Sequence, residues 1–90
     1  MTVPPYTVEL SPAAVRQLRK LEGPNRKRIL RAIAGLADDP RPSGVKALVG
    51  VPHALRIRVG DYRIVYEVHD GRLVVLVLAL GHRREVYRAR

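Results

Sequence analysis

The sequence lacks cysteine, and no hydrophobic run in it is long enough to cross a membrane. Without cysteine there is no disulfide framework and no thiolate metal site, which suits a reducing cytosol. The run LVVLVLAL has the length of a buried strand and falls far short of the roughly 20 residues that a membrane span needs. The segment MTVPPYTVEL has no basic region followed by an apolar one, so we expect no signal peptide. We predict a cytoplasmic protein with no membrane contact.

Acidic residues are scarce relative to basic ones. Eight Asp and Glu stand against 17 Lys and Arg, and the formal net charge is +9. Such a balance favours a polyanion or an acidic protein as the partner. Most of the excess is arginine, which binds phosphate through two parallel hydrogen bonds and does not lose its proton in proteins.

The chain also lacks internal repeats, low-complexity tracts and a linker between domains. Its 90 residues are enough for one modest hydrophobic core and too few for a second. We expect residues 1–90 to form a single domain.

The first half of the chain predicts a strand followed by two helices. The segment PYTVEL alternates as a strand does. Ser11 followed by Pro12 is typical of a helix N-terminus, and apolar residues then continue at helical spacing. Gly23 and Pro24 are expected to break the chain before a second helix over about residues 25–37. The apolar side of that helix carries Ile29, Ile33 and Leu36, and its basic side carries Arg26, Lys27, Arg28 and Arg31.

The second half predicts three strands after a connection over residues 45–53. They cover about residues 54–59, 62–68 and 72–80. The dipeptide Gly60-Asp61 separates the first two strands, with the spacing of a two-residue hairpin turn. The dipeptide Asp70-Gly71 is a strong signal for a type I′ turn between the second and third strands.

The first turn fixes the register of the first hairpin. If Val59 faces Tyr62, then Arg58 faces Arg63, and one face is a continuous apolar surface. The opposite face collects Arg56, Arg58, Arg63, Val65 and Glu67. Like charges directly opposite cost on the order of 0.2–1 kcal/mol, so the fold gains nothing obvious from this arrangement. A solvated charged face and an anion-binding face are the two interpretations.

The last strand is apolar on both faces. The type I′ register places Leu73, Val75, Val77 and Ala79 on the core face. It places Val74, Leu76, Leu78 and Leu80 on the arginine face. Something besides the two helices must therefore cover this second face. We expect the C-terminal tail HRREVYRAR to cover part of it, and either the tail or a partner segment to cover the remainder.

This order of elements predicts an α+β fold: an N-terminal strand, a two-helix hairpin and a three-stranded antiparallel meander (βααβββ), with the helices on one face and a short C-terminal tail. The segment LRIRVGDYRIVYEVHDGRLVVLVLALGHRREVY resembles the C-terminal half of the RelE/ParE toxin family. The shared features are a basic strand, a G-D-Y-R hairpin turn, a hydrophobic last strand and an H-R-x-x-x-Y ending. The helix pair and the lead-in VKALVG fit the same family, so the resemblance covers nearly the whole chain.

The resemblance implies one of two activities. RelE-like members are ribosome-dependent mRNA endonucleases, and ParE-like members are inhibitors of DNA gyrase. For the nuclease branch it implies a cationic site that needs no metal or other cofactor, in which the 2′-hydroxyl attacks the adjacent 3′-phosphate. Arg63 and Arg83 would stabilise the transition state, and Tyr87 would stack on a base or orient the attack. The RNA backbone would be held by Arg56, Arg58 and Lys46, and Arg58 would also be one of the catalytic residues.

One departure from the family pattern concerns the proton acceptor. Some RelE-like nucleases carry lysines where this chain has Arg56 and Arg58, and arginine does not accept a proton. Histidine changes charge near neutral pH, so His82, which adjoins Arg83, is the best titratable candidate for the base. His82 is equally a turn residue at a strand end, and the ribosome is an alternative source of the missing group.

The sequence therefore favours an mRNA endonuclease that acts on the ribosome and is neutralised, in a hetero-oligomer, by a cognate acidic antitoxin. A gyrase inhibitor on the same fold is the first alternative. A non-catalytic basic module that binds nucleic acid or an acidic protein is the second.

Overall fold

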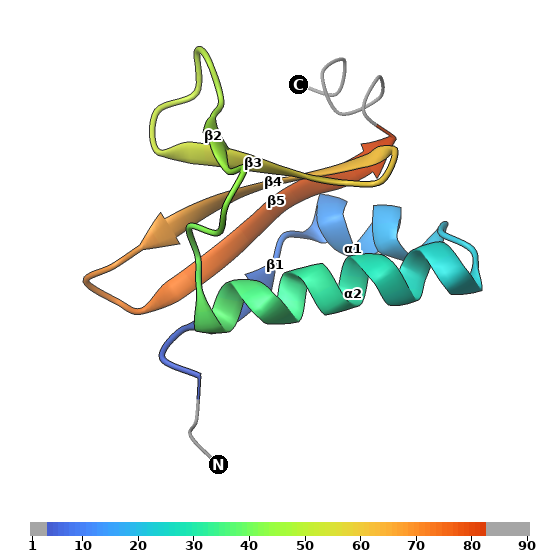
Figure 1. Ribbon diagram of the computed structural model, residues 1–90, viewed down its shortest axis with the longest axis horizontal. Coiled ribbons are helices and arrows are strands. Elements are labelled where there is room, and N and C mark those ends of the chain that lie inside the picture. The colour runs from blue at the N-terminus through green and yellow to red at the C-terminus, as the bar shows by residue number, and fades with distance from the viewer. Residues whose placement is uncertain (1–3, 83–90) are drawn as a thin grey trace.

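A computed structural model describes residues 4–82 of the chain. Strand β1 (Thr7–Leu10) leads into helices α1 (Pro12–Arg19) and α2 (Gly23–Asp38). Four strands follow: β2 (Lys46–Ala47), β3 (Ala54–Val59), β4 (Tyr62–His69) and β5 (Val74–His82). Both helices lie against one face of the sheet, which we call the inner face, while β2 and the loop after it rise above the other, the outer face (Figure 1). The predicted α+β class is confirmed, with β2 added inside the expected connection.

The five strands form one mixed sheet in the order β1-β5-β4-β3-β2. The meander is antiparallel as predicted, but β1 runs parallel to β5, with Thr7 paired with Val74 and Leu10 with Val77. After β1 the two helices lead the chain across the inner face to β2 at the far edge of the sheet. Two parallel strands need a long crossover connection of this kind. Strand β5 therefore has a neighbour on each side and is an interior strand of the sheet.

The register of the first hairpin is confirmed. Val59 pairs with Tyr62 and Arg58 with Arg63, so both arginines lie on the outer face. Gly60 has φ of 61°, which glycine adopts without strain in a two-residue turn.

The predicted type I′ turn at Asp70-Gly71 is wrong. His69 pairs with Val74, so a four-residue loop joins β4 to β5, and the residue with positive φ (54°) in that loop is Leu73. The N–H of Leu73 donates to the carbonyl of Asp70 at 3.3 Å. Leu73 consequently leaves the predicted core face and is 49% exposed.

A β-bulge at Leu78 changes the phase of β5. Tyr66 pairs with Val77 but Val65 pairs with Ala79, so Leu78 has no partner residue on β4. Before the bulge, Val75 and Val77 face the core as predicted. After it, the alternation is inverted.

The inversion corrects the predicted position of Leu80. Leu80 pairs with Ile64 and is fully buried in the main core, not on the outer face. Ala79 takes the opposite correction, because its partner Val65 lies on the outer face.

The main core lies between the helices and the inner face. Helix α2 buries Ile29, Ile33 and Leu36 as predicted, and its basic residues remain exposed. This helix begins at Gly23 instead of breaking there, with Pro24 in its first turn, where a missing N–H costs nothing. The fully buried residues with the largest side chains are Tyr66, Ile29, Leu36, Ile64, Leu80, Val75 and Val77.

Helix α1 is fastened to β5 at the bulge by two polar side chains. Ser11 caps the helix by accepting from the N–H of Ala14 at 3.1 Å, and its hydroxyl donates to the carbonyl of Leu78 at 2.7 Å. Further along the helix, the N–H of Leu80 donates to Oε1 of Gln17 at 2.7 Å. These side chains satisfy backbone groups of β5 beyond the end of β1.

A second, smaller apolar cluster covers part of the outer face. Ala54 and Val65 are buried there, packed against Leu48, Val51 and Leu78. Leu48 and Val51 belong to the loop between β2 and β3. This loop therefore covers part of the outer face. The C-terminal tail, which is also expected to cover part of that face, lies outside the described residues from residue 83 onward.

Within residues 4–82, no helix is both long enough and apolar enough to cross a membrane.

Substitution of Ser11 tests the joint between α1 and β5. Ser11→Ala removes one helix-capping bond and one bond to the strand, so we expect the free energy of unfolding to fall by about 1–3 kcal/mol. Ser43→Ala, in an exposed loop position, is the matched control and should change it by less than about 0.5 kcal/mol. Urea denaturation of both variants measures the difference, and equal stabilities would contradict the role of Ser11.

Candidate functional site

Four cationic side chains line one cleft at the outer face. The cleft has a volume of about 270 Å³ and is lined by Gly44, Lys46, Arg56, Ile57, Arg58 and Arg63. The cations come from three adjacent strands, β2, β3 and β4. The structure thus brings together the predicted RNA-binding residues and two of the predicted catalytic ones.

Strand pairing sets the positions of these cations. Lys46 pairs with Arg56, and Arg58 pairs with Arg63, so the cleft contains two directly opposed like-charged pairs. Arg58 and Lys46 are exposed, whereas Arg56 and Arg63 are half-buried. Such cations at a partly enclosed surface are suited to an anion, which more than one charge-assisted hydrogen bond would hold.

The tip of the hairpin that carries Arg58 is braced from both sides. The Nε of Arg58 donates to the carbonyl of Gly60 at 3.1 Å. The guanidinium of Arg28, from α2, lies so close to Gly60 that an added Cβ would approach it to 2.7 Å. Asn25 donates to the hydroxyl of Tyr62 at 3.4 Å. Helix α2 therefore holds the tip in place beneath the arginine cluster.

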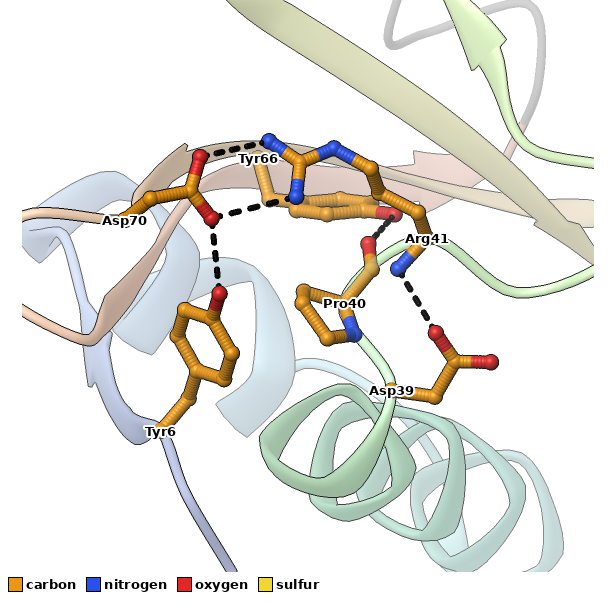
Figure 2. A network of polar contacts seen from close by, with 6 residues as sticks. All are labelled: Tyr6, Asp39, Pro40, Arg41, Tyr66 and Asp70. Carbon is orange, nitrogen blue, oxygen red and sulfur yellow. Dashed lines mark hydrogen bonds and ion pairs between the residues drawn. The ribbon is translucent and has the colours of Figure 1, made fainter.

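A polar network holds the segment that leads from α2 to Lys46 (Figure 2). Both terminal nitrogens of Arg41 donate to the carboxylate of Asp70, at 3.1 and 2.9 Å. The hydroxyl of Tyr6 donates to the same carboxylate at 2.7 Å. The buried hydroxyl of Tyr66 donates to the carbonyl of Pro40 at 2.7 Å. These contacts join the residue before β1, strand β4, the β4–β5 loop and the segment before β2.

The network changes the acidity of its members. The hydrogen bonds from Arg41 and Tyr6 lower the pKa of the Asp70 carboxyl to about 2. Burial raises the pKa of the Tyr66 hydroxyl to about 12, because the charged form would lose its hydration. At neutral pH Asp70 is therefore ionised and Tyr66 neutral, as their hydrogen bonds require.

His82 does not lie with the arginines. It pairs with Tyr62, and the two rings meet edge to face with centroids 6.1 Å apart. Tyr62 packs against the main core, so His82 is on the inner side of the sheet. The bulge at Leu78 causes this placement. The outer-face position beside Arg63 is held by Gly81, which has no side chain.

Two predicted site residues, Arg83 and Tyr87, lie outside the described residues. The network around Asp70 was not anticipated from the sequence, because its members are 64 and 29 residues apart in the chain and each is a common surface residue.

Comparison with known proteins gives the family. The family model described as "ParE toxin of type II toxin-antitoxin system, parDE" matches residues 8–87. The chain belongs to the RelE/ParE toxin superfamily. The resemblance drawn from the sequence motifs is thereby confirmed.

Relatives within the RelE/ParE superfamily align along almost their whole length. The chain is 31% identical over 86 residues to the mRNA interferase toxin RelE of Escherichia coli, covering 91% of this chain and 90% of the relative. It is 32% identical over 89 residues to toxin RelG of Mycobacterium tuberculosis, covering 93% and 98%. Among solved structures, the RelE-RelB complex of Pyrococcus horikoshii matches with a TM-score of 0.77 and 30% identity, covering 88% of this chain and 96% of that one.

Acid titration tests the network around Asp70. The pKa of Asp70 is about 2 in the folded protein and near 3.8 without its partners, so its stabilising contribution is complete above pH 4 and disappears as the pH falls through 2. We expect Asp70→Asn to be less stable than the unchanged protein at pH 5, and the difference to shrink between pH 4 and pH 2. Thermal unfolding across this range measures it. Asp38→Asn, at the exposed end of α2, controls for the loss of a negative charge. A difference that does not depend on pH would contradict the network's role.

Proposed function

We propose that this protein is an mRNA interferase that cleaves messages on the ribosome. The observation that carries the proposal is the convergence of Lys46, Arg56, Arg58 and Arg63 on one cleft. The mRNA interferase activity named for the E. coli relative, at 31% identity over 90% of its length, supports the same function.

The geometry suits cleavage of RNA by its own 2′-hydroxyl. The 2′-oxygen attacks the adjacent 3′-phosphate in line, and negative charge builds on the phosphoryl oxygens and on the departing 5′-oxygen. Fixed cations aimed at that charge are the largest catalytic contribution available, and loss of one such donor costs about 10²- to 10³-fold in rate. Arg63 faces the developing charge at the phosphoryl group. Arg56 and Arg58, on the neighbouring strand, hold the RNA backbone.

Binding of an anion explains why the cleft contains two directly opposed pairs of cations, Lys46 with Arg56 and Arg58 with Arg63. Arg58 and Arg63 repel each other in the empty protein, and a phosphate between them reverses that repulsion. The repulsion between the two arginines is tolerated in the folded protein because a bound phosphate supplies the compensating negative charge. By the family resemblance, Arg83 and Tyr87, which are outside the described residues, would also take part in the reaction.

Inhibition of DNA gyrase is the second candidate function. The matching family model is described as a ParE toxin, and this chain has arginine at the two β3 positions where some RelE-like nucleases have lysine. A gyrase inhibitor needs no group that exchanges a proton, so this departure favours it over the nuclease.

Removing the positive charges of the cleft one at a time tests the proposed nuclease function. We expect Arg58→Ala and Arg63→Ala to abolish growth inhibition in a bacterial host, while the free energy of unfolding stays equal or rises by about 0.2–1 kcal/mol because a repulsion is lost. Arg31→Ala, on the exposed side of α2, is the matched control and should remain toxic.

The 5′ ends of transcripts, mapped after brief induction, distinguish the candidate functions. In-frame cuts within translated messages support the nuclease, and DNA damage with intact messages supports the gyrase inhibitor. Arginine variants that lose stability and keep toxicity would contradict the role of the cleft. A harmless chain would leave only the non-catalytic basic module.

We further propose that a cognate acidic antitoxin neutralises this protein in a hetero-oligomer. The net charge of +9 favours an acidic partner. The structure of the P. horikoshii relative is a complex of RelE with RelB. An acidic segment in the cleft would neutralise Arg58 and Arg63 and exclude RNA.

Co-expression with the neighbouring gene tests the partner. We expect the tagged toxin to retain the neighbour's product through purification, and Arg58→Glu/Arg63→Glu to weaken retention because like charges then meet. Retention unaffected by this double charge reversal would place the partner elsewhere on the surface, and no retention at all would contradict the proposal.

A further inference from the structure

Cleavage of the phosphodiester leaves one chemical requirement that the arginines do not meet. The 5′-oxygen departs as a strongly basic alkoxide unless a proton reaches it as the bond breaks. Arginine binds and stabilises negative charge, but its guanidinium does not release a proton in proteins. The cleft therefore needs a different group beside the three arginines.

We propose that Lys46 is the general acid that protonates the leaving 5′-oxygen. This inference rests on the proposed nuclease function. Among the described residues that line the cleft, Lys46 is the one whose side chain can release a proton, since the others are glycine, isoleucine and arginine. An ammonium group carries three donor protons on a flexible stem, so it can follow the oxygen as the bond lengthens.

The strand pairing places Lys46 at the correct side of the cleft. Its partner on β3 is Arg56, so the Lys46 side chain is on the outer face, next to the backbone-holding arginines. Arg63 lies on β4, across β3 from Lys46. A phosphate held between them would have its phosphoryl oxygens toward Arg63 and one bridging oxygen toward Lys46.

The short strand β2 is held firmly enough to position a reacting group. The N–H of Val45 donates to the carbonyl of Pro42 at 3.1 Å, and the N–H of Leu48 donates to the carbonyl of Ala54 at 3.0 Å. Gly44, with φ of 87°, turns the chain into the strand. Further back, Arg41 is fixed to Asp70.

The proton balance of the step is complete. The 2′-oxygen forms a bond to phosphorus, the bond from phosphorus to the 5′-oxygen breaks, and Nζ of Lys46 gives its proton to that oxygen. The proton of the 2′-hydroxyl passes to water, and solvent returns a proton to Lys46. The products are a 2′,3′-cyclic phosphate and a 5′-hydroxyl.

The experiment compares two leaving groups on messages bound to purified ribosomes. One message has the natural linkage at the cleavage site, and the other has sulfur in place of the 5′-bridging oxygen. A thiolate is a much weaker base than an alkoxide and departs without a proton. The variants are Lys46→Arg, which keeps the charge but cannot donate the proton, and Lys27→Arg on α2 as the control.

We expect Lys46→Arg to slow cleavage of the natural message about 10²-fold or more, and to cleave the sulfur-containing message at nearly the rate of the unchanged protein. Lys27→Arg should match the unchanged protein on both. Equal losses on the two messages would mean that Lys46 only binds or positions RNA, and no loss on either would mean that its charge suffices. Both results would overturn the inference. If the unchanged protein cleaves neither message on ribosomes, the proposed nuclease function itself fails.

Discussion

The β-bulge at Leu78 is the constraint on which the rest of the structure depends. Strand β5 is the one strand that contacts β1, β4 and α1, and it must present apolar residues to the core on both sides of the bulge. The extra residue lets Val75 and Val77 face the core before it and Leu80 after it. Ser11 and Gln17 bind the backbone of β5 at and just after the bulge, so α1 contacts the strand where its phase changes.

The same bulge shapes the candidate site. Because it inverts the alternation, glycine instead of a larger side chain lies beside Arg63 on the outer face, and His82 is turned toward Tyr62 on the inner side. Gly81 therefore adds no side chain beside Arg63 on this face. The bulge in β5 thus determines which residue of that strand lies beside Arg63 at the candidate site.

The parts of the fold that could be predicted from the sequence are those marked by local chemistry. Gly60-Asp61 gave the register of the first hairpin, and Ser11-Pro12 gave the start of α1, because each signal reflects a backbone conformation that few residues adopt. The bulge could not be predicted. A strand that is apolar on both faces carries no polar alternation, so nothing in LVVLVLAL marks where the phase changes.

The candidate site was predictable to a similar extent. The arginine cluster followed from the register of one hairpin, which is a local property. The arrival of Lys46 beside Arg56 depends on β2, a strand of two residues inside an expected loop, and is set by long-range contacts such as that between Arg41 and Asp70. Contacts of this kind between ordinary surface residues leave no pattern in a single sequence.

Strand β3 leaves part of one sheet edge without a neighbouring strand. β2 pairs only with Leu55 and Arg56, so in the described part of the chain the remainder of β3 is an open sheet edge. Open edges are templates on which a second molecule can add a strand. Antiparallel pairing of two copies about Arg58 would set two guanidinium groups opposite each other, which disfavours such dimers. The charge of Arg58 at this edge therefore disfavours strand pairing between two copies, whereas Arg63 lies on β4, an interior strand of the sheet.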